Sequence, residues 1–581
     1  MQQLKLLRYY LKLTQFGTSE PVKLALADIA DTVSTSPRHA RTLLKQMAQL
    51  EWLTWQPSVG RNQRSSLRLL YSAVELKQHL AKVQIASGDY ASALSLLDED
   101  QQWFGRLLIA TSGASHRDGS LNLQLTYSRP FSAVLPHLML RNSERFLLRQ
   151  LYANLVTCDA EGAIHSDLAH HWQCDDKAQV YRFYLRPGLQ FHDGCVIDAH
   201  SVVDLFVALQ AHSSYQHELS HLNGVKAVNE LTVEFSLASS DKGFAGLLAD
   251  PKYAIQPVTQ LTQSDLSNKL VVGSGPFALL NHNAQRLQLR ANANYHGFRA
   301  LPDEVSIWFV AKSAVAKEGQ YAFASNDDSQ PQHLQQRLEF GCQYLLFNQQ
   351  KQKLSYSQRR WLASYLQPET LLRSAQKSLQ SLALEPAYSL LDIWPDCISL
   401  AADKVPLPKS LSIGFYQHDD LQLYAETIAK LLEELGVSTC LQAFSYAELN
   451  QAASQGLLKQ DLIVTSYNLD DNRPASAFRW LYNDPIIKHC IGPENWQWMQ
   501  TQLGQLRANT SLQDYFSQMT PLANTLVSEY WCLPLFHHWQ TLRFQNMLQD
   551  VAMTDWGWPQ IKDVWTTQQQ FSAAEPLKFS C

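Results

Sequence analysis

The sequence predicts a multidomain α/β protein with a small basic head and a large body of mixed strands and helices. Its 581 residues exceed one ordinary domain, and a hydrophobic content of 45% provides material for several cores. Residues 1–71 carry ten Lys or Arg and four acids, a net charge of +6, whereas the remaining 510 residues carry −11. From about residue 119 onward, strand and helix patterns alternate. This asymmetry indicates that the head meets a polyanion and the body does not.

Three helices are predicted in the first fifty residues. Residues 3–16 place leucines at helical spacing among cations, and residues 27–33 suit a short second helix. The turn that follows ends in Ser36, a preferred N-cap, and Pro37 takes the favoured first position of a third helix. Apolar residues of that helix repeat at helical spacing and form one buried stripe.

The opposite stripe of the third helix carries the functional prediction. A helix, a tight turn and a basic helix form the geometry in which a recognition helix enters the major groove. Strands at 52–56 and 66–71 flank a basic loop, which predicts a wing that reaches phosphates. The predicted DNA-contacting residues are Ser36, Arg38, His39, Arg41, Thr42 and Lys45 on the helix and Arg61, Asn62 and Arg64 in the loop.

These features predict a winged helix-turn-helix domain at residues 1–71 that binds double-stranded DNA. The alternative is a helical domain with a solvated basic face. RNA is a poorer partner, because no stacking aromatics interleave with the cations. Residues 72–118 predict two or three helices without a 34-residue repeat, and this connector is either a spacer or a contact of a homodimer.

Two segments of the body carry specific motifs. Residues 181–209 (YRFYLRPGLQFHDGCVIDAHSVVDLFVAL) predict a strand, two turns and a helix that begins at Asp198. Residues 273–310 predict a Gly-Pro turn, two strands, a loop with Tyr295 and another strand. Both segments resemble signatures of the family-5 extracellular solute-binding proteins, as do residues 344–348, 411–437 and 461–471.

This resemblance extends over roughly residues 119–565 and implies a two-lobed, periplasmic-binding-protein-like (type II) solute-binding fold. Lobe 1 would combine residues 119–341 with a C-terminal return at 533–581, and lobe 2 would span 342–532. Such bodies close on a ligand by a hinge. By the same resemblance, the ligand lies between the lobes, and the segment after the strand at 462–466 supplies a carboxylate to it.

The candidate ligand-binding residues are Tyr127, Arg129, Tyr467, Asp470, Asp471 and Trp539. The forked guanidinium of Arg129 suits a ligand carboxylate or phosphate. Asp470 or Asp471 suits an amine or sugar hydroxyls. The alternative for the two acids is that they are solvated loop residues, and for Trp539 that it belongs to the core.

The head and body together resemble the SgrR family of bacterial transcriptional regulators, with matches such as RHARTLLKQM at 38–47 and PLFHHW at 534–539. The resemblance implies a cytoplasmic regulator of sugar-phosphate-stress genes that senses a sugar, a sugar phosphate or a peptide. The alternative function is a solute- or oligopeptide-binding component of an ABC-type transport system. Cations interrupt the N-terminal apolar residues, and the absence of a signal peptide counts against the transport alternative.

Other classes of site are not expected. The nine cysteines are scattered without a CxxC pair, which indicates reduced thiols. The histidines show no metal-ligand spacing, and motifs for a catalytic nucleophile or a phosphate-binding loop are absent. Apolar runs stay well below the roughly 18 residues of a membrane span. We therefore expect no enzyme activity, cofactor, metal ion or membrane partner.

Overall fold

The computed structural model describes residues 2–58, 64–97, 100–110, 113–117, 119–262, 271–310, 321–323, 332–350, 352–375, 379, 382–397, 401–545, 548–549 and 551–566. The chain divides into two compact units. The described residues up to Ala110 belong to the first unit, and those from Gly113 to Phe309 and from Gln332 onward belong to the second.

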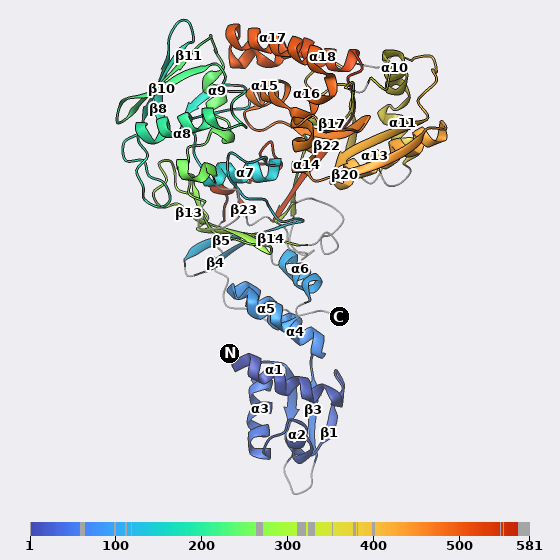
Figure 1. Ribbon diagram of the computed structural model, residues 1–581. Coiled ribbons are helices and arrows are strands. Elements are labelled where there is room, and N and C mark those ends of the chain that lie inside the picture. The colour runs from blue at the N-terminus through green and yellow to red at the C-terminus, as the bar shows by residue number, and fades with distance from the viewer. Residues whose placement is uncertain are drawn as a thin grey trace. The chain divides into compact units, whose positions relative to one another are not determined.

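The first unit begins with three helices and a small sheet (Figure 1, blue). The helices are α1 (Gln2–Leu13), α2 (Leu26–Thr32) and α3 (Pro37–Gln49), and β1 (Val22–Leu24), β2 (Leu53–Gln56) and β3 (Ser65–Leu69) form an antiparallel sheet in the order β1-β3-β2. As predicted, α3 starts at a cap in which the Ser36 hydroxyl accepts the His39 N–H at 3.3 Å. The sequence does not predict β1, because three residues are too few to show an alternating pattern.

Tyr10 links α1 to the sheet by packing and hydrogen bonds. Its ring is fully buried and packs edge-on against Trp52, with 5.8 Å between centroids. Its hydroxyl donates to the carbonyls of Trp52 at 3.0 Å and Tyr71 at 2.8 Å. Burial raises the pKa of Tyr10 to about 12, so the hydroxyl remains a donor. The helices and the hairpin therefore share one core.

Three helices form the connector: α4 (Ala73–Ser87), α5 (Tyr90–Leu96) and α6 (Gln101–Ala110). A capping box between Ser72 and Glu75 starts α4, and Gly88, with a φ of 85°, ends it in the left-handed conformation that glycine permits. The sequence assigned residues up to 118 to this connector. In the structure β4 (Gly113–Arg117) pairs antiparallel with β5 (Ser120–Tyr127), so these residues are a strand of the body.

The body contains a large mixed sheet in the order β12-β13-β14-β5-β15-β22-β17-β21-β19-β20. Lobe 1 contributes β5, β12 (Phe277–His282), β13 (Arg286–Ala291), β14 (Glu304–Phe309), β15 (Tyr321–Phe323) and β16 (Gln332–Leu338). Lobe 2 contributes β17 (Gly341–Phe347), β18 (Leu384–Pro386), β19 (Ser410–Tyr416), β20 (Ser438–Phe444) and β21 (Leu462–Asn468). The long strand β22 (Cys532–Gln545) belongs to both: its first half pairs with β17 and β18, and its second half pairs with β15 and β16.

A second, four-stranded sheet completes lobe 1. It consists of β8 (Ala169–Cys174), β9 (Val180–Leu185), β10 (Leu222–Asn229) and β11 (Thr232–Leu237), next to α8 (Ala199–Ala211) and α9 (Phe244–Leu248). Small two-stranded pairs are formed by β6 (Val156–Cys158) with β7 (Ile164–Ser166) and by β23 (Leu548–Gln549) with β24 (Trp565–Thr566). As predicted, the Asp198 carboxylate caps α8 by accepting the Ser201 N–H at 2.8 Å.

The two motifs of the body contact each other. The His192 ring bonds to the backbone of Gly273 at 3.3 Å and of Gly275 at 3.2 Å. Both glycines press against the end of α7 (Asn142–Leu151), where an added Cβ would lie 2.0 to 2.5 Å from backbone atoms of Leu151. These motifs therefore hold α7 in place.

Lobe 2 is rich in helices. They are α10 (Tyr356–Tyr365), α11 (Pro368–Ser374), α13 (Asp419–Glu434), α14 (Tyr446–Ser454), α15 (Arg473–Asn483), α16 (Pro485–Ile491), α17 (Pro493–Asn509) and α18 (Tyr515–Ser528). Figure 1 shows α15 beside α9 of lobe 1.

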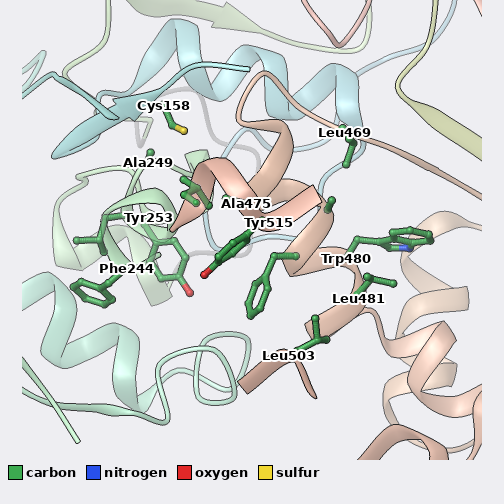
Figure 2. Packing of buried hydrophobic residues seen from close by; sticks show 14 of the residues in the cluster. Cys158, Phe244, Ala249, Tyr253, Leu469, Ala475, Trp480, Leu481, Leu503 and Tyr515 are labelled. Carbon is green, nitrogen blue, oxygen red and sulfur yellow. The ribbon is translucent and has the colours of Figure 1, made fainter. Parts of the chain in front are cut away.

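The lobes share a buried interface at this place. Figure 2 shows Phe244 and Tyr253 of lobe 1 in one cluster with Tyr515 and Trp480 of lobe 2. The Tyr515 hydroxyl lies so close to Gly243 that a Cβ there would clash with it. At the edge of the cluster, Arg507 of α17 donates to Asp241 of lobe 1 at 2.8 Å. The structure therefore presents the body with its lobes together.

Candidate functional site

The exposed face of α3 carries the predicted recognition residues. Ala40, Leu43, Leu44 and Met47 are buried on the opposite face. The six predicted helix residues, Ser36, Arg38, His39, Arg41, Thr42 and Lys45, are all exposed. The sequence of α3 contains no acidic residue, so nothing on the helix neutralises its cations. Arg64 is exposed directly before β3, whereas Arg61 and Asn62 lie outside the described residues.

A cavity of about 660 Å³ lies between the lobes of the body. Lobe 1 lines it with residues after β5 and with the start of α7. Lobe 2 lines it with Tyr416 and Ser466 at the ends of the parallel strands β19 and β21, and with the starts of α13, α14 and α16. The carboxyl ends of parallel strands are where open α/β sheets place their ligands. This volume lies within the range of small-molecule sites.

Three of the six predicted ligand residues line the cavity. Tyr127 is largely buried and stacks on Phe131 with 4.8 Å between centroids. Arg129 donates to Glu144 at 3.1 Å and to the Ser143 hydroxyl at 2.8 Å, so its guanidinium is held by its own lobe.

Tyr467 also lines the cavity, with its hydroxyl turned away to the Ser476 carbonyl at 2.5 Å. Its ring stacks on Trp480 with centroids 4.3 Å apart, so it contributes a flat aromatic surface to the wall. Burial raises the pKa of Tyr467 well above its usual value.

Asp470 does not line the cavity. Its side chain is 1% exposed and lies behind two guanidiniums, Arg145 of lobe 1 at 2.6 Å and Arg479 of lobe 2 at 3.2 Å. Asp250 of lobe 1 completes the cluster, because it pairs with Arg145 at 3.1 Å and also with Arg479. Burial raises the pKa of Asp470, and Arg145 opposes that shift. Each carboxylate therefore contacts cations from both lobes.

Asp471 and Trp539 also lie away from the cavity wall. Asp471 accepts the backbone N–H of Asp555 at 2.8 Å, which ties lobe 2 to the C-terminal return. Trp539 donates its ring N–H to Glu385 at 3.2 Å and is 37% exposed, whereas its strand neighbour His538 faces the cavity. The cause is the alternation of side chains along a β-strand.

Sequence reasoning missed Arg141, Arg145, Arg479 and Tyr446, which all line the cavity. Arg145 and Asp470 are 325 residues apart in the sequence, and no local spacing reveals such a contact. Arg141 is the N-cap residue of α7, and its guanidinium lies over the Tyr446 ring, 5.9 Å from the centroid. The only available signal is the pair of arginines four residues apart at a helix start.

Among the described residues, four carboxyl groups line the cavity: Glu218, Glu339, Asp420 and Asp484. Glu218 is bonded to Lys252 and to the Tyr253 hydroxyl, both at 2.7 Å. Asp484 accepts two backbone N–H groups at the start of α16, and burial raises its pKa to about 6. Both groups are therefore engaged by the protein itself.

Glu339 and Asp420 stand close together near two histidines. Burial and the charge of Asp420 raise the pKa of Glu339 to about 8, so its carboxyl is protonated near neutral pH. His418 and His538 lie 3.8 and 4.0 Å from Asp420, and burial lowers the pKa of His538. A protonated carboxyl offers both a donor and an acceptor, which suits hydroxyl groups.

Across the described ranges, no cluster of three or more His, Cys, Asp and Glu side chains is arranged to hold a metal ion. A search of the same residues found no helix with the length and apolar character needed to cross a membrane.

Comparison with known proteins adds independent evidence. Residues 5–119 match the family described as "Sugar transport-related sRNA regulator N-term", and residues 163–360 match "Bacterial extracellular solute-binding proteins, family 5 Middle". The HTH-type transcriptional regulator SgrR of Yersinia pseudotuberculosis is 31% identical over 573 residues, which cover 98% of this chain and 99% of that protein. The chain belongs to the SgrR family of transcriptional regulators.

A second SgrR, from Salmonella typhimurium strain LT2, is 30% identical over 97% of this chain and 98% of that protein. Membership of the SgrR family confirms the resemblance found in the sequence and places this chain among regulators of transcription. The transport alternative has no better support.

Solved structures confirm the fold prediction for the body. The periplasmic binding protein AgaA of A. tumefaciens R10, in complex with agropinic acid, superposes with a TM-score of 0.62 at 17% identity and covers 77% of this chain and 99% of that chain. A dipeptide-binding protein of Pseudoalteromonas sp. SM9913, in complex with Met-Leu, gives a TM-score of 0.62 at 14% identity and covers 76% of this chain and 99% of that chain. At such identities the likeness establishes the fold alone.

Proposed function

We propose that this SgrR-family protein binds specific DNA sites through α3 and the wing, and that a small solute in the cavity of the body changes this binding. The observation that carries the proposal is the union, in one chain, of an exposed acid-free basic helix with a body that encloses a cavity of about 660 Å³. A ligand acts by its differential affinity for two conformations of the body.

On the DNA side, Arg38, Arg41, Thr42 and Lys45 lie on one exposed face of α3. Arginine and lysine side chains can bond guanine edges in the major groove, and a threonine can contact a base or a phosphate. Ser36 and His39 stand at the start of the helix, where recognition helices approach base edges. Arg64, which is exposed directly before β3, would contact a backbone phosphate.

The solute is a sugar, a sugar phosphate or a peptide, and the protein acts in the cytoplasm, where the DNA is. Tyr127 and Tyr467 contribute flat walls to the cavity, and Glu339 with Asp420 offers partners for hydroxyl groups. A homodimer formed through the connector stays a prediction, as does the absence of catalysis, which family membership supports.

DNA capture tests the first half of the proposal. The full-length protein is incubated with sheared chromosomal DNA, and the retained fragments are sequenced. We expect a few enriched sites, and Arg38→Ala/Arg41→Ala should lose on the order of 1–3 kcal/mol per contact and abolish the enrichment. The control Lys177→Ala/Lys404→Ala removes the same charge from exposed positions of the body and should bind as the wild type does. Equal enrichment by both double variants would contradict the assignment.

A further inference from the structure

One corner of the cavity brings together guanidiniums from both lobes. Arg141 and Arg145 stand one turn apart at the start of α7 in lobe 1, and Arg479 comes from α15 in lobe 2. Residues four apart share one face of a helix, so both α7 arginines reach the same wall. Tyr446, at the start of α14, closes the corner from lobe 2.

The charges at this corner do not cancel. Asp250 and Asp470, each 1% exposed, balance Arg145 and Arg479 from behind and do not reach the cavity. Arg141 stays as an additional positive charge: within the described part of the chain its guanidinium contacts the Tyr446 ring and has no carboxylate partner. The positive end of the α7 dipole points the same way.

Tyr446 adds a hydrogen-bond donor. Among the described residues its hydroxyl has no hydrogen-bond partner, although its ring packs edge-on against Tyr416 at 5.4 Å. Burial raises the pKa of Tyr446 above its usual value, so the O–H keeps its proton. A neutral hydroxyl next to a guanidinium can donate a hydrogen bond to an oxygen of an anion and brings no negative charge that would repel it.

Among the residues that the structure describes, an ammonium group would find no available counter-ion at this corner. Arg145 and Arg479 stand between Asp470 and the cavity, and Lys252 already holds Glu218. Asp484, which also lines the cavity, serves as the cap of α16. A cationic ligand group would therefore face three guanidiniums without an available acid, at a cost in Coulomb energy.

We infer that the corner formed by Arg141, Arg145, Arg479 and Tyr446 receives an anionic group of the ligand, a phosphate or a carboxylate. This inference rests on the proposed sensing function. It narrows the ligand to solutes that carry an anionic group, and it excludes peptides that would be held by their amino terminus. Because the corner includes both lobes, the anion would hold the lobes together. Glu339 and Asp420 would then be available to hydroxyl groups of the same molecule.

Calorimetric titration of the full-length protein in phosphate-free buffer tests the inference. The probes are inorganic phosphate, glucose 6-phosphate, gluconate, glucose and trialanine amide, a peptide that has an ammonium group and no carboxylate. We expect at least one anionic probe to bind about tenfold or more tightly than glucose and trialanine amide, as a charge-assisted hydrogen bond allows. Comparison of the affinities for glucose 6-phosphate and gluconate shows whether the corner prefers a phosphate or a carboxylate.

Two variants locate the anion. Arg141→Gln removes a charge that no carboxylate balances, so the fold should persist, and it should weaken the anionic probe about tenfold or more. Tyr446→Phe should weaken the same probe by a smaller factor. Arg360→Gln, which removes an exposed cation of α10 outside the cavity, is the matched control and should bind as the wild type does.

Failure of all three anionic probes to bind, tighter binding of trialanine amide than of any anionic probe, or unchanged anion binding by Arg141→Gln would each overturn the inference. DNA capture with the same preparations separates this failure from that of the proposed function. A wild-type protein that enriches specific DNA sites but binds no anion keeps its function as a regulator and loses the anion site.

Discussion

At the scale of single residues, charged side chains form two groups at the cavity: the arginines with the two acids behind them, and the pair Glu339 and Asp420. Arg145 and Arg479 hold Asp250 and Asp470 in a buried cluster that joins the lobes. Breaking a buried ion pair by removal of one partner leaves an uncompensated charge and costs several kcal/mol. Asp470 is therefore a structural residue of the closed body. This explains why it does not face the cavity, although it follows the strand that was predicted to supply a carboxylate to the ligand.

Glu339 has a pKa of about 8 against an ordinary value of 4.5, which makes the stability of the body depend on pH. The charge of Asp420 contributes to this shift, and Asn468 donates to the Glu339 carboxyl at 3.3 Å. His418 and His538 lie 3.8 and 4.0 Å from Asp420. The folded protein keeps a proton that the unfolded chain releases above its ordinary pKa. The stabilising contribution is therefore present below about pH 4.5 and is lost as the pH rises towards 8.

Glu339→Gln should remove this dependence. Relative to the wild type, we expect the free energy of unfolding of the variant to increase between about pH 5 and about pH 8, by less than about 1.4 kcal/mol per pH unit. Urea unfolding followed by tryptophan fluorescence measures it, with the exposed Glu161→Gln as control. A constant difference between the variant and the wild type across that range would refute the protonated state of Glu339.

At the scale of elements, the sequence predicted what depends on local chemistry. The Ser36 and Asp198 caps start α3 and α8 as predicted, because capping needs only neighbouring residues. The ligand site was predicted in part: Tyr127, Arg129 and Tyr467 line the cavity, and the arginine corner was missed. That corner depends on contacts between α7 of lobe 1 and α15 of lobe 2. Such contacts form only when the two lobes come together, so the periodicity of the sequence does not reveal them.

The wing and α3 should contribute to DNA binding in different ways. Arg64 stands at the start of β3, beside the loop, and not on the helix that meets base edges. Arg64→Ala should therefore weaken binding to all sequences alike and reduce the slope of log affinity against log salt by about one unit. Fluorescence anisotropy over a salt series, on a captured site and on a scrambled duplex, gives both quantities. Loss of binding confined to the captured site would show that Arg64 reads bases.

At the scale of the whole molecule, the protein joins a DNA-binding unit to a solute-binding unit in one chain. The lobes of the body share buried aromatic residues and ion pairs next to the cavity. Opening the body would expose this interface to water, so a ligand that bridges the lobes can favour the closed state by its differential affinity alone. Regulation then requires that the two states of the body differ in their effect on the head.

The most direct test of this account is the occupancy of chromosomal sites by the full-length protein in cells, with and without sugar-phosphate stress. Immunoprecipitation and sequencing should show a few sites whose occupancy by the wild type and by Arg360→Gln changes under stress. Arg38→Ala/Arg41→Ala should occupy none of them, and Arg141→Gln should occupy them without the change. A normal stress response of Arg141→Gln, or normal occupancy by Arg38→Ala/Arg41→Ala, would contradict the account.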